Sequence, residues 1–211
     1  MKGNVLNISS NTVKEIELPE KFFSIPEKKY LAYAAVKRQL TNRRRGTADT
    51  QERSDVSYST RKMRPQKGSG RSRQGAKTSN IWKGGAVAFG PHPKKYYVKL
   101  NKKEKITAVF SALSSKFREG NVHIVEGVKI AGKTKEIIAL MKSVSNNSNK
   151  DLGTVLIVYS DEDGAVERAA RNIPYCKPLN FKFLNVYDLV VYDSLICTKS
   201  AVEGMKGWWK G

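Results

Sequence analysis

The sequence predicts an α/β fold with a mainly parallel sheet flanked by helices, into which a long basic loop without regular structure is inserted. After Asn101, segments with strand and helix periodicity alternate along the chain, and this order is typical of parallel strands joined by helices. The apolar run at residues 154–159 suits a central parallel strand that is buried on both faces. Residues 43–95 show neither period and are rich in Gly and Pro, which indicates a loop.

Two strands and a helix are expected before the basic loop. Apolar residues within 5–8 and 14–18 predict short strands around a turn at residues 9–11. Pro26 is expected to open a helix over residues 28–41, where apolar residues recur at approximately helical spacing.

The remaining elements are expected after the loop. Between Asn101 and Gly120, apolar residues at i, i+3, i+4, i+7 and i+11 predict an amphipathic helix. The elements that follow are strand 122–125, helix 135–144, strand 154–159, helix 164–172, strand 181–186, a helical turn at 189–191 and strand 194–198. Ser200 and Glu203 form a capping-box pattern for a last helix. The expected apolar face of that helix is Ala201, Val202, Met205, Trp208 and Trp209.

These elements predict one α/β globular domain made of residues 1–42 and 96–211, with residues 43–95 as an extended loop. The length of 211 residues suits one domain with an extension. The loop cannot build a core of its own. Between residues 56 and 80, its only hydrophobic side chains are Val56, Tyr58, Met63 and Ala76.

The positive charge of the chain is concentrated in and beside this loop. The formal net charge is +20, and residues 56–103 contain 13 Lys or Arg in 48 residues without one Asp or Glu. Residues 37–105 carry +16, whereas the other 142 residues carry +4. A segment so one-sided in charge predicts a polyanionic partner.

Other classes of function find little support. No apolar run reaches the ~20 residues of a membrane span, and the N-terminus lacks the apolar core of a signal peptide, so no membrane contact is expected. Cys176 and Cys197 lack CxxC spacing, which predicts buried free thiols in a reducing compartment. His92 and His123 are far apart in the sequence and no cluster has metal-ligand spacing. We therefore expect no metal, no cofactor and no catalytic residue.

The chemistry of the loop predicts RNA binding. Arg side chains fork onto phosphates and Lys side chains supply positive charge, while aromatic residues are too sparse for a platform that stacks single strands. A segment threaded through folded RNA and ordered by binding fits this composition. For Trp82 and Phe89, packing onto the domain is favoured over stacking on bases. The residues expected to contact phosphate or to allow close backbone passage are Arg43, Arg44, Arg45, Arg61, Lys62, Arg64, Lys67, Gly68, Gly70, Arg71, Arg73, Gly75, Lys77 and Lys83.

Several short motifs resemble the ribosomal protein L-four family of bacterial-type large subunits. They are RGT at residues 45–47, DVS at 55–57, QKGSGRSR at 66–73, GG at 84–85, FGP at 89–91, KK at 102–103, NVYD at 185–188 and TKSAVE at 198–203. The resemblance spans nearly the whole chain, and the block at 66–73 within an acid-free loop is fairly specific.

The resemblance implies a Rossmann-like domain at the ribosome surface and a structural, rRNA-binding role without catalysis. The implied partners are large-subunit rRNA, neighbouring large-subunit ribosomal proteins and the nascent peptide, in a cytoplasmic or organellar ribosome. The loop would line the nascent-peptide exit tunnel with a tip formed by Lys62, Met63, Arg64, Pro65, Gln66 and Lys67. Where the family usually has an aromatic residue followed by Arg, this chain has Arg64 and Pro65.

Two other functions are left open by the sequence. Residues 127–134, GVKIAGKT, match the phosphate-binding pattern of P-loop NTPases between a predicted strand and a predicted helix. Against this function, Val128 and Ile130 are β-branched where such a loop wraps phosphate, and Glu126 would repel it. A free RNA-binding regulator would share the basic loop.

Overall fold

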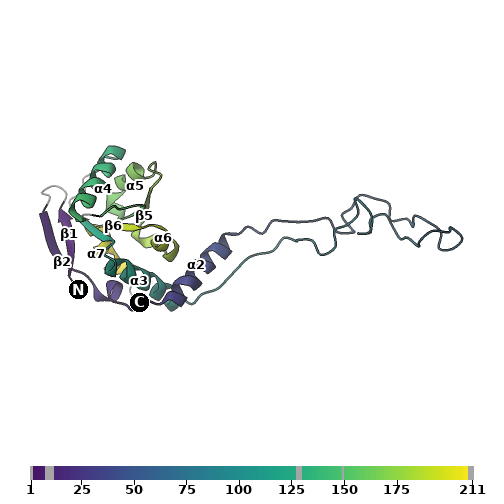
Figure 1. Ribbon diagram of the computed structural model, residues 1–211, viewed down its shortest axis with the longest axis horizontal. Coiled ribbons are helices and arrows are strands. Elements are labelled where there is room, and N and C mark those ends of the chain that lie inside the picture. The colour runs from purple at the N-terminus through teal and green to yellow at the C-terminus, as the bar shows by residue number, and fades with distance from the viewer. Residues whose placement is uncertain (1, 8–11, 127–129, 149, 209–211) are drawn as a thin grey trace. The chain divides into compact units, whose positions relative to one another are not determined.

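The computed structural model describes residues 2–7, 12–126, 130–148 and 150–208 of the chain. The chain divides into two compact units, one of Met1–Leu40 with Lys99–Gly211 and one of Thr41–Val98. The first unit contains a six-stranded sheet with helices on both faces (Figure 1). The second unit contains most of the basic segment.

The sheet is mixed but mainly parallel, with the strand order β2-β1-β3-β6-β4-β5. The antiparallel pair is β1 (Lys2–Asn7) with β2 (Thr12–Glu17). The strands parallel to β1 are β3 (Val122–Glu126), β4 (Val155–Tyr159), β5 (Cys176–Asn180) and β6 (Ser194–Thr198). The expected α/β class and the mainly parallel sheet are thereby confirmed.

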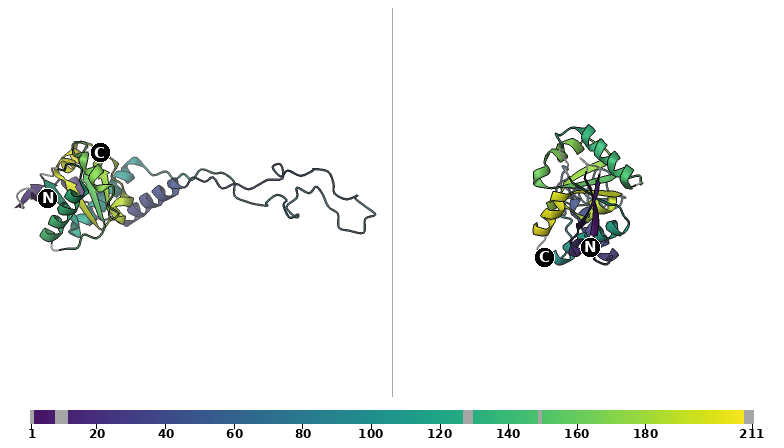
Figure 2. Two further views of the ribbon diagram at one scale, coloured as in Figure 1. Left: turned by 90° about the horizontal axis from the view of Figure 1, so that it is seen from above. Right: turned by 90° about the vertical axis from the view of Figure 1, so that its left-hand side faces the viewer.

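Helices cover the two faces of the sheet (Figure 2). Alternate residues of β4 divide between two core clusters, with Leu156 on one face and Ile157 on the other. One face is covered by α4 (Thr134–Ser148) and α5 (Ala165–Ala170). The other face is covered by α1 (Glu20–Phe23), α3 (Lys102–Arg118), α6 (Val186–Val191) and α7 (Lys199–Trp208). Among the described residues, no helix has the length and apolar character needed to cross a membrane.

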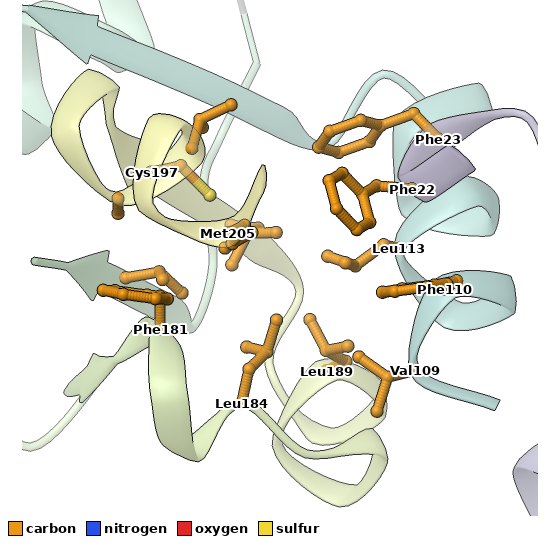
Figure 3. Close-up of a cluster of buried hydrophobic side chains, with 14 of the residues drawn as sticks. Phe22, Phe23, Val109, Phe110, Leu113, Phe181, Leu184, Leu189, Cys197 and Met205 are labelled. Atoms are coloured by element: carbon orange, nitrogen blue, oxygen red, sulfur yellow. The ribbon is translucent and has the colours of Figure 1, made fainter. Parts of the chain in front are cut away.

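The core cluster around α3 holds the N-terminal part of the unit in place (Figure 3). The rings of Phe22 and Phe110 meet edge-on with their centroids 4.8 Å apart, and those of Phe23 and Phe117 lie 5.5 Å apart. Leu113, which the heptad-like spacing of the helix predicts to face inward, is buried beside them. Aromatic pairs of this kind contribute about 0.5–1.5 kcal/mol beyond the area that they bury.

Two buried serines of α3 fix the chain that leads into α2 (Lys29–Arg43). The Ser114 hydroxyl accepts a hydrogen bond from the backbone N–H of Ile25 at 3.1 Å and donates to the carbonyl of Phe22 at 3.2 Å. The Ser111 hydroxyl accepts from the backbone N–H of Lys28 at 2.7 Å. Sequence reasoning missed both α1 and these anchors, because a serine on the apolar face of a helix carries no signal of its partner.

The expected strand at residues 181–186 is wrong. Phe181–Phe183 form a short 3-10 helix, η2, and the strand lies earlier, as β5. The side chain of Asn180 accepts a hydrogen bond from the backbone N–H of Lys182 at 3.0 Å, which starts the helical turn. Pro178 weakens the sequence signal of β5, and it is tolerated there because β5 lies at the edge of the sheet.

The expected capping box of the last helix is also wrong. α7 begins at Lys199, and Thr198 caps it by accepting a hydrogen bond from the backbone N–H of Ala201 at 3.3 Å. The Ser200 hydroxyl instead donates to Asp163. The expected turn at residues 9–11, the preceding residue 8, Trp209 and the side chain of Trp208 lie outside the described part of the chain.

Phe23→Ala tests the core around α3. The side chain is 1% exposed, so we expect the free energy of unfolding to fall by about 3–5 kcal/mol in urea titrations. Phe183→Ala is the matched control, because that ring is 71% exposed, and it should change stability by less than about 0.5 kcal/mol. Equal losses from the two substitutions would contradict this account of the core.

The reactivity of the two cysteines tests whether the core is closed to solvent. Both are free and buried, as expected, and burial raises the pKa of each thiol to about 12. Since the thiolate is the nucleophile, the native protein should not react with a disulfide reagent at about pH 8, whereas both thiols should react after unfolding in guanidinium chloride. Rapid labelling of the native protein would show that the core opens readily.

Candidate nucleic-acid interface

The unit Thr41–Val98 is held together by hydrogen bonds between its two ends. From Arg44 to Asn101, all described, the chain contains no helix or strand. At its base, the Asn42 amide accepts from the backbone N–H of Val98 at 2.7 Å and donates to the Val98 carbonyl at 3.3 Å. Further along, the backbone N–H of Lys94 donates to the carbonyl of Gly46 at 3.0 Å. We call residues 41–58 the first arm and residues 76–98 the second arm.

A second group of contacts joins the arms beyond this base. The backbone N–H of Val87 donates to the carbonyl of Gln51 at 3.1 Å, and the Thr50 hydroxyl donates to the carbonyl of Pro91 at 3.3 Å. His92 lies between two carboxylates of the first arm, with Nδ1 3.3 Å from Asp49 and Nε2 3.5 Å from Glu52. The arms are thus paired without forming a regular ladder.

Cation–ring contacts and a small buried group add to the pairing. The Arg44 guanidinium lies 4.1 Å from the centroid of the Tyr96 ring, and the Lys77 ammonium lies 4.4 Å from that of Tyr58. Such contacts contribute about 0.5–1 kcal/mol at exposed sites. The residues buried within this unit are Val56, Thr78 and Ala86.

The acidic residues of this unit contact His92 or a backbone N–H rather than the cations of the unit. Asp49 and Glu52 face His92, and Asp55 accepts a hydrogen bond from the backbone N–H of Glu52 at 3.0 Å. Within residues 41–98, no Lys or Arg lies within 4.0 Å of a carboxylate oxygen of the described chain. The positive charge is therefore free to meet an external anion.

The structure places the predicted contact residues in this unit, most of them on its surface. The exposed cations are Arg43, Arg44, Arg45, Arg61, Lys62, Lys67, Arg71, Arg73 and Lys83. Arg64 and Lys77 are half-buried. Gly68 and Gly70 have φ of +82° and +62°, so they are needed for the backbone conformation rather than for close packing inside the chain. A Cβ at Gly75 would also meet nothing within 4 Å.

Four of the six residues expected at the tip, Lys62, Met63, Arg64 and Pro65, line a hollow of about 730 Å³ together with Tyr58, Ser59, Arg61 and Lys77. Gln66 and Lys67 do not line it. Lys62 donates a hydrogen bond to the side chain of Gln66. The backbone N–H of Met63 donates to the carbonyl of Gly75 at 3.3 Å, which turns the chain back toward the second arm. The expected tip residues thus include both exposed positive charge and the exposed apolar side chain of Met63.

Trp82 and Phe89, two aromatic residues of the second arm, differ in their exposure. Trp82 is half-buried, and its indole Nε1 has no hydrogen-bond partner among the described residues. Phe89 is fully exposed, so the expectation that its ring packs onto the domain is wrong. The cause is its backbone, which adopts the left-handed region with φ of +54° and directs the ring into solvent.

The connection between β3 and α4 does not resemble a phosphate cradle in its described part. The backbone N–H of Ala131, which a phosphate-binding loop would offer to its ligand, donates to the Glu136 carboxylate at 2.8 Å. Glu126, at the end of β3, pairs with Lys199 at 2.7 Å, and this hydrogen bond lowers the pKa of the Glu126 carboxyl. Residues 127–129 of the P-loop-like pattern lie outside the described chain.

Comparison with known proteins identifies the family of this chain. A sequence model described as the ribosomal protein L4/L1 family matches residues 16–208. The chain belongs to this family. As a member of the L4/L1 family, it is a structural constituent of the large ribosomal subunit.

Curated relatives from the same family match this protein over nearly its full length. The large ribosomal subunit protein uL4 of Pelotomaculum thermopropionicum is 41% identical over 197 residues, which cover 93% of each chain. That of Desulforamulus reducens is 40% identical over 202 residues, or 95% of each chain. That of Desulfatibacillum aliphaticivorans is 38% identical over 207 residues, or 98% of each chain.

Asn42→Ala tests whether the base of the arms is closed in the free protein. Both hydrogen bonds to Val98 are lost, and each contributes about 1 kcal/mol, so we expect hydrogen exchange of the Val98 amide to be faster by about fivefold or more. Mass spectrometry of peptic peptides measures this rate. Asn80→Ala, at an exposed position of the second arm, is the control. An unchanged rate at Val98 in Asn42→Ala would mean that the arms are already open.

Proposed function

We propose that this protein binds large-subunit rRNA through residues 43–95, while residues 1–42 and 96–211 form the folded domain that anchors this basic loop. The observation that carries the proposal is the charge of the loop. Its three acidic residues face His92 or a backbone N–H, and its Lys and Arg side chains have no carboxylate oxygen within 4.0 Å among the residues that the structure describes. Such a segment is stable next to a polyanion, because each phosphate that it neutralises releases counterions.

We infer that the phosphate contacts come from the predicted cations of the loop, with Gly68, Gly70 and Gly75 beside them. Chemistry supports Arg in particular, because its guanidinium binds phosphate in a bidentate geometry. The resemblance to the family supports a position of residues 62–67 at the wall of the exit tunnel, next to the nascent peptide. Neighbouring large-subunit proteins would then contact the folded domain, and the protein would reside on the ribosome.

We further propose that the protein is not an enzyme. A P-loop NTPase needs backbone N–H groups that are free to bind phosphate. The N–H of Ala131 is occupied by Glu136, and Glu126 brings a second carboxylate to the preceding strand end. Among the described residues, no group of His, Cys, Asp and Glu could hold a metal ion. A free RNA-binding regulator would share the loop but would be absent from large subunits isolated on sucrose gradients.

Arg71→Ala with Arg73→Ala tests the rRNA contact. Both side chains are exposed, and neither has a carboxylate oxygen within 4.0 Å among the described residues. For an in vitro transcribed large-subunit rRNA, the negative slope of log K against log salt should therefore become shallower by about 1.4–1.8 in the double variant. Arg168→Ala with Arg171→Ala removes the same charge from exposed positions in and beside α5 and should leave the slope unchanged. Filter binding at several salt concentrations measures it. The same loss in both double variants would mean that only net charge matters.

A further inference from the structure

Phe89 combines an unusual backbone conformation with a fully exposed ring. It is the one non-glycine residue with positive φ in the described chain. Its ring is fully exposed, although phenylalanine is normally a buried residue. A bulky side chain in the left-handed region is a genuine outlier, and such outliers persist at ligand-binding sites when the surrounding structure fixes them.

Contacts on both sides of Phe89 fix this conformation. Before it, the backbone N–H of Val87 is bonded to Gln51. After it, Thr50 lies so close to Gly90 that a Cβ there would be 2.1 Å from the Thr50 hydroxyl, and the same hydroxyl bonds to Pro91. His92 then sits between Asp49 and Glu52. The first arm therefore ties down the chain on either side of Phe89 and leaves the ring itself without a partner in this unit.

The surroundings of Phe89 decide what the ring can meet. The second arm contains no Asp or Glu, and the nearby carboxylates of Asp49 and Glu52 on the first arm face His92. The unpaired charge of this segment is therefore positive, and a polyanion is its complementary partner. Within RNA, the apolar surface that can receive an aromatic ring is the face of an unstacked base. Stacking of this kind does not need charge, and it contributes measurably to binding at each base.

We propose that Phe89 stacks on an unpaired base of the large-subunit rRNA, and that the cross-arm contacts hold its ring ready before binding. The proposal rests on the proposed function, that the basic loop binds rRNA. It adds a base contact to a segment whose other side chains are suited to phosphates. Because stacking tolerates any base, Phe89 would favour a site where a base is unpaired rather than a particular nucleotide sequence.

Three substitutions at Phe89 separate the ring from the backbone. Phe89→Ala should weaken binding to the in vitro transcribed rRNA by about fivefold to 150-fold, with the salt slope unchanged because no charge is lost. Phe89→Trp keeps a stacking ring and should bind within about threefold of the parent protein. Phe89→Gly relieves the backbone but removes the ring, so it should bind as weakly as Phe89→Ala. Parent-like binding by Phe89→Gly would show that only the backbone conformation matters and would overturn the proposal.

The controls distinguish this inference from the function on which it rests. Phe183→Ala removes another exposed ring, in the first unit, and should leave rRNA affinity unchanged. Ultraviolet cross-linking of the parent complex should give a nucleotide adduct on the peptide that contains Phe89. If the parent protein binds with a steep salt slope but Phe89→Ala binds equally well and no adduct forms there, Phe89 does not stack on RNA. If the parent protein itself shows no salt-dependent binding, the proposed function fails first.

Discussion

The unit Thr41–Val98 depends on pairing two arms that repel each other. Arg43, Arg44 and Arg45 lie on the first arm, and Lys94 and Lys95 on the second, so like charges are brought together at its base. The contacts that hold the arms are mostly neutral backbone and amide hydrogen bonds. Neutral contacts leave the cations unpaired, and at 0.1 M salt the repulsion between exposed charges is largely screened only beyond about 10 Å. The acidic residues of the unit are exposed, and they contact His92 or a backbone N–H rather than the cations.

Within the first unit, the chain that leads to the basic segment is held by the core. α2 has no fully buried residue, but its partly buried side chains pack against the core cluster, and these are Leu31, Ala32, Ala35 and Val36. The chain that precedes α2 adds to this attachment. That chain is fixed by the Phe22 and Phe23 rings and by the hydroxyls of Ser111 and Ser114 on α3. α3 is also the helix that follows the second arm in sequence. One helix therefore stabilises the chain on both sides of the inserted segment.

Much of the fold could be predicted from periodicity, because helices such as α3 and buried strands such as β4 show their burial pattern directly in the sequence. Sequence reasoning failed where a side chain of one segment decides the conformation of another. Asn180 starts a helical turn where a strand was expected, and Thr198 takes the capping role expected of Ser200. The exposure of most cations of the loop could be predicted from their charge alone. The exposure of Phe89 could not, since it depends on a φ angle set by contacts with Thr50 and Gln51, far away in the sequence.

The parallel pairing of β1 with β3 has a consequence for the order in which the chain folds. Val5 lies opposite Ile124, so the two strands come from opposite sides of the basic segment. During synthesis from the N-terminus, β1 and β2 are made first, and β1 can pair with β3 only after the whole insertion has been made. The contact is of high sequence separation and therefore slow to form. The cationic arms are thus exposed to the cell's nucleic acids before the sheet that carries them is complete.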